Sequence, residues 1–134
     1  MAYFGKEFKF ASEENYEAFL TALENAGAKS LNFLNYKPNQ GVRKNGDQYT
    51  LFIHAETFKR EINFKNGETV PDELNSELKG KSTFTVDGDV ITQVLDFGPK
   101  GAVTFKREYS ADSLKVTVSA SIVDGSAVRH YVPV

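Results

Sequence analysis

Hydrophobic and polar residues alternate at every second position along most of the chain. That period is typical of β-strands with one buried face, because successive side chains of a strand point to opposite sides. The alternation first appears in residues 5–10 and returns after Pro38 for the rest of the sequence. Between these two parts the period changes to that of a helix. The pattern therefore predicts one strand, a helical segment and then a long run of strands.

The helical segment is predicted to contain two short helices. In residues 12–25 the apolar side chains recur at intervals of three and four, which is typical of an amphipathic helix. Ser12 is the predicted N-cap of this helix, and Gly27 marks its end. A second helix is predicted from Lys29 to about Tyr36, because the proline that follows cannot continue it.

Turn sequences divide the rest of the chain into strands. Asn-Gly or Asp-Gly steps begin at residues 45, 66, 87 and 124, and such steps favour tight hairpins. The strands that follow the first are predicted at 41–44, 48–54, 58–64, 68–73, 79–86, 90–97, 102–109, 114–122 and 127–133. We expect a mainly β fold, a ten-stranded antiparallel up-and-down β-barrel forming a single domain over residues 1–134. A barrel of that size has room for a ligand.

One predicted strand places a positive charge on its apolar face. In residues 103–109 the odd positions carry Val103, Phe105, Arg107 and Tyr109, so Arg107 shares the side that faces inward. A guanidinium keeps its proton and therefore its charge when it is buried. Burying that charge costs free energy unless an anion pairs with it. We therefore expect Arg107 to receive the carboxylate of a ligand inside the barrel.

Two further polar residues are expected on the same inner face. If the last turn has two residues, Arg129 lies opposite Ala120, whereas a four-residue loop places it opposite Val118. Both registers direct Arg129 and Tyr131 inward. The alternative is that each arginine pairs with an acid of the protein itself or reaches the rim of the barrel. Gln93 is a further candidate for an inward polar group.

Composition narrows the possible functions. The chain has no Cys and only two His, far apart in sequence, so neither a metal site nor a cofactor is predicted. A formal net charge of −2 gives no general attraction for nucleic acid. No apolar run is long enough to span a membrane and no signal-peptide pattern is present, so we expect a cytoplasmic protein. We also expect a monomer. The absence of a catalytic sequence motif argues against an enzyme.

Several short sequences resemble those of a known family. They are SEENY at residues 12–16, KPN at 37–39, NGD at 45–47, EINF at 61–64, GE at 67–68 and RHY at 129–131. In this order and spacing they resemble the intracellular lipid-binding proteins, which include fatty-acid-binding and cellular retinoic-acid-binding proteins. The resemblance runs the whole length of the chain. It implies a β-clam with a helix-turn-helix lid and a carboxylate site formed by Arg107, Arg129 and Tyr131.

The resemblance also narrows the expected ligand. Members that bind retinol typically have Gln at the two arginine positions, so Arg107 and Arg129 imply an acid. Phe58 resembles a phenylalanine at the opening of the family's barrel. Tyr16 and Phe19 are candidates for the helix side of that opening.

The leading hypothesis is a non-enzymatic intracellular carrier that binds a long-chain fatty acid or a similar hydrophobic carboxylate and transports it through the cytoplasm. A carrier of retinoic acid, or of another retinoid or carotenoid-type molecule, is the alternative. An enzyme acting on lipids and a membrane-adhering module rank lower. Transient membrane contact through the helix pair, with Lys29 and Lys37, is a further expectation.

Overall fold

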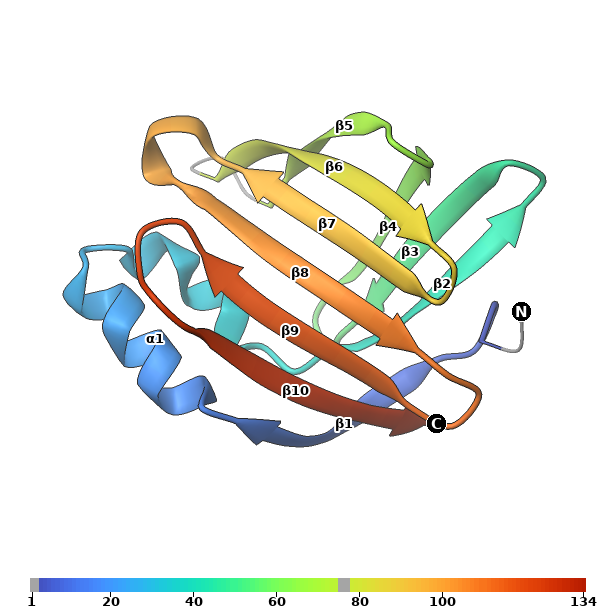
Figure 1. Ribbon diagram of the computed structural model, residues 1–134, viewed down its shortest axis with the longest axis horizontal. Helices are drawn as coiled ribbons and strands as arrows, with labels where there is room; N and C mark the ends of the chain where they lie inside the picture. Colours follow the sequence, from blue (N-terminus) through green and yellow to red (C-terminus); the bar gives the residue numbers. More distant parts are fainter. Residues whose placement is uncertain (1–2, 75–77) are drawn as a thin grey trace.

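The computed structural model describes residues 3–74 and 78–134 as an antiparallel sheet rolled into a nearly closed barrel, with helical turns at one end (Figure 1). Within these residues the sheet has ten strands in the spatial order β4-β3-β2-β1-β10-β9-β8-β7-β6-β5. The strands are β1 (Phe8–Glu14), β2 (Asn39–Asn45), β3 (Gln48–His54), β4 (Lys59–Lys65), β5 (Thr69–Glu73), β6 (Lys79–Asp87), β7 (Val90–Asp96), β8 (Ala102–Tyr109), β9 (Leu114–Ala120) and β10 (Ser126–Pro133). The predicted ten-stranded antiparallel barrel is confirmed, and the strands after the first lie within two residues of their predicted bounds.

The first strand differs from its prediction. It was expected at residues 5–10 but spans Phe8–Glu14, so Ser12 lies in a strand and is not the N-cap of a helix. Ser12 pairs with His130 of β10, after a bulge in the register that follows Phe10. The backbone hydrogen bonds that join β1 to β10 therefore outweigh the local capping preference of a serine.

Helix α1 (Tyr16–Asn25) begins three residues later than the sequence predicted. Its N-cap is Asn15, which has φ 58, a left-handed conformation that asparagine tolerates better than most residues. The Asn15 side chain does not cap the helix; it donates a hydrogen bond of 2.8 Å to the carbonyl of Ser126. Gly27, with φ 82, ends the helix as expected.

The second helical segment is a 3₁₀ helix, η1 (Lys29–Asn35), so the pair consists of one α-helix and one tighter turn. Leu31 and Leu34 are both buried, and their spacing of three residues matches the three residues per turn of a 3₁₀ helix. In the described part of the chain, no helix has the length and apolar character needed to cross a membrane.

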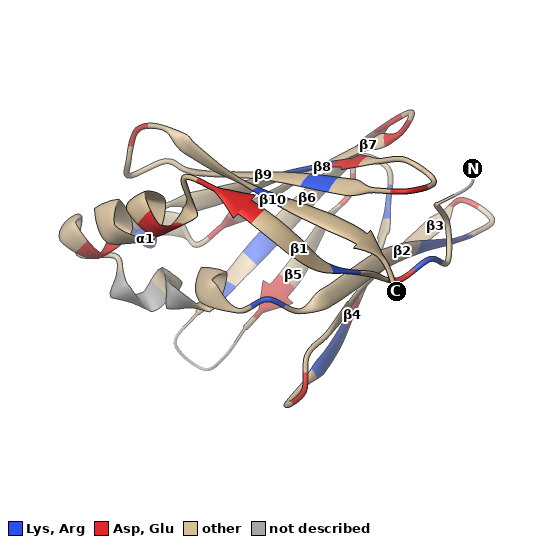
Figure 2. Cartoon of the chain, turned by 90° about the horizontal axis from the view of Figure 1, so that it is seen from below, with Lys and Arg blue, Asp and Glu red and all other residues tan. Residues whose placement is uncertain are grey.

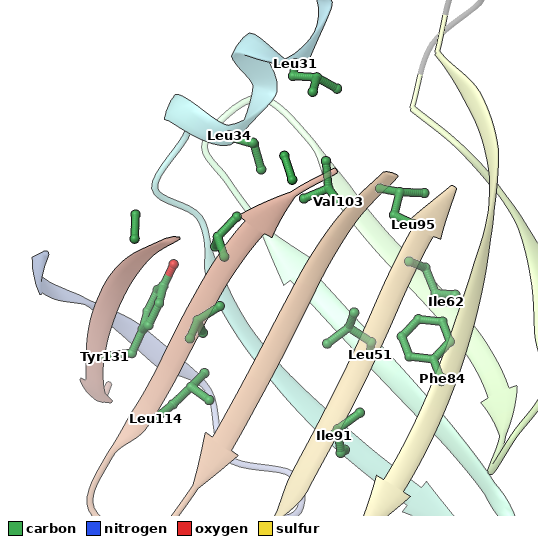
Figure 3. Close-up of a cluster of buried hydrophobic side chains, with 14 of the residues drawn as sticks. Leu31, Leu34, Leu51, Ile62, Phe84, Ile91, Leu95, Val103, Leu114 and Tyr131 are labelled. Carbon is green, nitrogen blue, oxygen red and sulfur yellow. The ribbon is translucent and has the colours of Figure 1, made fainter. Parts of the chain in front are cut away.

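Stacked aromatic rings contribute to the core of the barrel. The rings of Phe64 and Phe84 lie 3.9 Å apart and nearly parallel, and Tyr49 continues the stack at 5.3 Å from Phe64. Tyr3 stacks on Tyr109 with 4.6 Å between ring centroids. Aliphatic side chains from neighbouring strands point into the same interior, as Figure 3 shows. These stacked rings do not line the cavity that lies elsewhere in the barrel.

As far as the structure describes it, the sheet has one open seam, between β4 and β5. No strand pairing joins these two strands within the described residues, although each pairs on its other side. Across the seam, the guanidinium of Arg60 on β4 donates to the carboxylate of Asp72 on β5. A side-chain ion pair therefore bridges the seam where the backbone does not. Acidic residues away from the seam lie at the end of β1 and on α1, as Figure 2 shows.

Candidate functional site

A cavity of about 480 Å³ lies inside the barrel, bounded on one side by η1 and the start of α1. Most of the side chains around it are apolar or aromatic, as in sites for small organic ligands. Its charged and amide lining residues are Gln40, Arg60, Asp72, Glu73, Gln93, Arg107 and Arg129. The cavity therefore combines apolar walls with several groups that can form strong hydrogen bonds.

Arg107 is buried and faces this cavity, as its alternation on β8 predicts. The β8–β9 register places it opposite Val116, which is the pairing that a loop of residues 110–113 requires. Its Nε donates to Gln40 Oε1 at 2.9 Å, and its Nη1 donates to Gln93 Oε1 at 2.8 Å. Its guanidinium also lies 5.0 Å from the ring of Phe105. Within the described residues no carboxylate contacts Arg107, so its charge has only neutral partners.

Burial is the main influence on the ionisation of Arg107. Desolvation lowers the pKa of its guanidinium, while Tyr109, Tyr131 and Asp72 act in the opposite direction. An arginine nevertheless keeps its proton in proteins. The site therefore holds a cation that has lost water and gained no anion.

A network of polar side chains continues from Arg107 to the seam of the barrel. Gln93 Nε2 donates to Ser82 Oγ at 2.8 Å and to Asp72 Oδ2 at 3.2 Å. Ser82 Oγ donates to the same carboxylate oxygen at 2.7 Å, and Arg60 donates to the other oxygen of Asp72. The network thus links strands β4 to β8 through side chains alone.

Arg129 is equally buried but has a protein anion as its partner. Its Nε donates to Glu13 Oε2 at 3.1 Å, and its terminal nitrogens donate to the carbonyls of Asn35 and Tyr36. Its guanidinium also lies 3.8 Å from the ring of Tyr16. The expected alternative, an arginine paired with an acid of the chain, therefore describes Arg129 and not Arg107.

Both registers considered for the last hairpin are wrong. Arg129 lies opposite Val116, because the loop between β9 and β10 is longer than either prediction allowed. The error is an even number of residues, so the inward direction of Arg129 and Tyr131 is unchanged. Arg107 and Arg129 flank the same residue of β9 from its two sides.

Tyr131 also lies where the sequence placed it. Its ring belongs to the cluster of buried side chains in Figure 3. It meets the ring of Phe10 edge-on at 6.2 Å between centroids, and it lines the cavity. In the part of the chain that the structure describes, its hydroxyl makes no hydrogen bond to a protein group. That hydroxyl is therefore available to a ligand.

The other predicted pocket residues divide into two groups. Tyr16, Phe58 and Gln93 line the cavity. The Tyr16 hydroxyl donates to the carbonyl of Leu34 at 2.7 Å, and burial raises its pKa. Phe19 is not among the lining residues, and it is buried in the core that α1 shares with the barrel.

The site residues that were not anticipated from the sequence include Gln40, Asp72, Ser82 and Glu13. Asp72 could have been found, because it lies two residues after Val70 and therefore on the same face of the strand predicted at 68–73. Glu13 could not, because the sequence assigned it to the first turn of a helix. Its pairing with Arg129 depends on the extension of β1.

In the described residues, ten antiparallel strands surround a partly polar cavity, with a short helical segment after the first strand. This arrangement defines the class of small ligand-binding β-barrels. No protein-family model matches the chain. It is similar to fatty acid-binding protein 1 of Manduca sexta, with 40% identity over 131 residues covering 98% of each chain. Fatty acid-binding protein 2 of Manduca sexta is 36% identical over the same shares. The chain belongs to the intracellular lipid-binding protein family.

The fold agrees with this family. The solved structure of the fatty-acid-binding protein isolated from Manduca sexta superposes with a TM-score of 0.80 at 35% sequence identity. The match covers 97% of this chain and 98% of that one. The likeness therefore extends over almost the whole chain.

Proposed function

We propose that this protein is a non-enzymatic carrier that binds a long-chain fatty acid, or a similar hydrophobic carboxylate, inside the barrel. The observation that carries the proposal is Arg107, a buried cation at the cavity whose hydrogen-bond partners are two neutral amides. A ligand carboxylate supplies the missing anion and accepts charge-assisted hydrogen bonds. The relatives named for fatty acids support the same ligand class.

The two parts of such a ligand match the two parts of the cavity. The head group meets Arg107 and the free hydroxyl of Tyr131. The hydrocarbon tail lies against lining residues such as Phe33, Ile53 and Leu74. Burial of the tail contributes about 0.8 kcal/mol per CH₂ before the costs of ordering the ligand.

The ligand class is tested by extracting lipids from purified protein and identifying them by mass spectrometry. We expect long-chain fatty acids in the extract, and stoichiometric binding of oleate to the delipidated protein in calorimetry. Competition between oleate and retinoic acid then separates the fatty acid carrier from the retinoid carrier. A delipidated protein that binds neither acid overturns the proposal.

Replacing Arg129 with Leu is expected to weaken oleate binding, by less than about tenfold. Glu13 already compensates the charge of Arg129, so this arginine contributes mainly through the potential at the head group and through its contacts with Tyr16. Calorimetry with oleate measures the change. The matched variant Glu13→Gln releases Arg129 and should strengthen oleate binding. Unchanged affinity in both variants contradicts a role for Arg129 in head-group binding.

We further propose that α1 and η1 form the lid of the cavity and the surface that meets membranes during ligand transfer, in a monomeric cytoplasmic protein. Lys37 lies next to η1, with its ammonium 4.9 Å from the ring of Phe10; the side chain of Lys29 lies outside the described residues. Transfer of a fluorescent fatty acid to anionic vesicles should slow as salt is added. A rate that depends on neither salt nor anionic lipid contradicts the membrane contact.

A further inference from the structure

The charges around the cavity almost cancel. Arg60 is paired with Asp72, and Arg129 is paired with Glu13. Arg107 alone among these five side chains lacks a partner of opposite charge within the described residues. Three cations and two anions leave one positive charge, and it is located on Arg107.

One more acid lines the cavity without changing this balance. Glu73 approaches Lys79 at 3.7 Å, and its side chain is 58% exposed. Solvent screens such a pair, so neither charge acts strongly on the buried groups. Glu13 is also partly exposed, but it contacts the buried guanidinium of Arg129 directly at 3.1 Å and so stays in the balance. The surplus of one positive charge therefore describes the three arginines of the cavity and the acids that pair with them.

Asp72 is the buried acid in this balance, with 2% of its surface exposed. Its two oxygens accept hydrogen bonds from Arg60, Ser82 and Gln93, a pattern of acceptance that fits an ionised carboxylate. Gln93 in turn accepts from Arg107. Asp72 is thus one side chain away from the candidate head-group site.

We propose that Asp72 restricts the cavity to ligands with a single negative charge. The inference rests on the proposed function, in which Arg107 receives one carboxylate. By neutralising Arg60, Asp72 removes the cation that could meet a second carboxylate on the ligand. Asp72 is therefore a residue that determines specificity, and it does so without contacting the head group itself.

The physical consequence differs between two ligands of equal length. A long-chain monocarboxylate brings one charge to Arg107 and an apolar tail to the rest of the cavity. An α,ω-dicarboxylate brings a second charge, which is either buried without a cation or kept in solvent at the cost of tail burial. Repulsion from Asp72 adds to the penalty. We expect the protein to prefer hexadecanoate to hexadecanedioate.

The test is the substitution Asp72→Asn, which keeps an oxygen acceptor of the same size and frees Arg60. The affinity for hexadecanedioate relative to hexadecanoate, measured by calorimetry, should rise by about tenfold or more. The double substitution Arg60→Gln with Asp72→Asn restores the original surplus of one positive charge. It should return the ratio to the wild-type value. The monomethyl ester of hexadecanedioic acid controls for chain length and should not gain from Asp72→Asn.

Glu61→Gln is the matched control, because it removes one negative charge from an exposed pair on the outer face of β4. The ratio should not change in this variant. An unchanged ratio in folded Asp72→Asn protein overturns the inference, as does an equal change in Glu61→Gln. If urea titrations show that Asp72→Asn is not folded, Arg60→Gln tests the same ion pair from its other side. It leaves Asp72 unpaired, so hexadecanoate binding should weaken about tenfold, and unweakened binding overturns the inference.

Different results would contradict the proposed function and the proposed role of Asp72. If the wild-type protein binds no hexadecanoate, the proposed function itself is wrong. If it binds hexadecanoate normally and the ratio does not respond to Asp72→Asn, only the role of Asp72 is wrong.

Discussion

Replacing Arg107 with Gln is expected to weaken oleate binding about 10- to 100-fold. Hydrogen bonds to a charged group contribute about 1.5–3 kcal/mol, and this substitution removes the unpaired cation while keeping a polar side chain near Gln40 and Gln93. The free energy of unfolding of the ligand-free protein should rise or stay constant, because a buried charge without an anion opposes folding. Calorimetry and urea titration measure the two quantities.

Oleyl alcohol, which has the same tail and no charge, is the control ligand for Arg107→Gln. Its affinity should be unchanged or increased, since the site no longer has to leave a cation unpaired. If oleate and oleyl alcohol lose affinity equally, the substitution has disturbed the cavity as a whole. Such a result contradicts the assignment of Arg107 to the head group.

Replacing Phe84 with Ala is expected to lower the free energy of unfolding by about 3–5 kcal/mol. Phe84 is fully buried and stacks on Phe64, so its loss leaves a void beside that ring in a close-packed core. A urea titration of the ligand-free protein measures the change. Such a loss is a large part of the stability of a domain of this size.

Val94→Ala is the matched control for Phe84→Ala, because Val94 lies on the outer face of the neighbouring strand β7 and is 38% exposed. Its effect should stay within about 0.5 kcal/mol, as for most surface substitutions. Equal effects of the two substitutions contradict the view that the ring stack stabilises the barrel.

The strand pattern predicted most of the fold because a period of two is a strong signal in a sheet with one buried face. It failed at Ser12, whose local preference indicated a helix cap. Pairing with β10, more than a hundred residues away, decides the structure there. The helical segment was located between the first strand and the others, but its second part is a 3₁₀ helix, in which buried Leu31 and Leu34 stand one turn apart.

For the candidate site, the sequence predicted which side chains point inward but not how close they lie to one another. The inward side of Arg107 and Arg129 follows from parity, which an error of two or four residues in a hairpin does not alter. The length of the last loop decides which residue lies opposite Arg129, and its Asp-Gly step fits several lengths. The pairing of Glu13 with Arg129 depends in turn on the unpredicted extension of β1, so the difference between the two arginines became visible only in the structure.

The seam between β4 and β5 has a consequence for how such a barrel can change its width. Elsewhere in the described sheet, neighbouring strands are joined by backbone pairing, which fixes their spacing whatever the side chains are. At the seam the spacing depends instead on side-chain contacts such as the ion pair of Arg60 with Asp72. The circumference of this barrel is therefore set by side-chain contacts at one place and by the hydrogen-bonded ladder elsewhere in the described sheet.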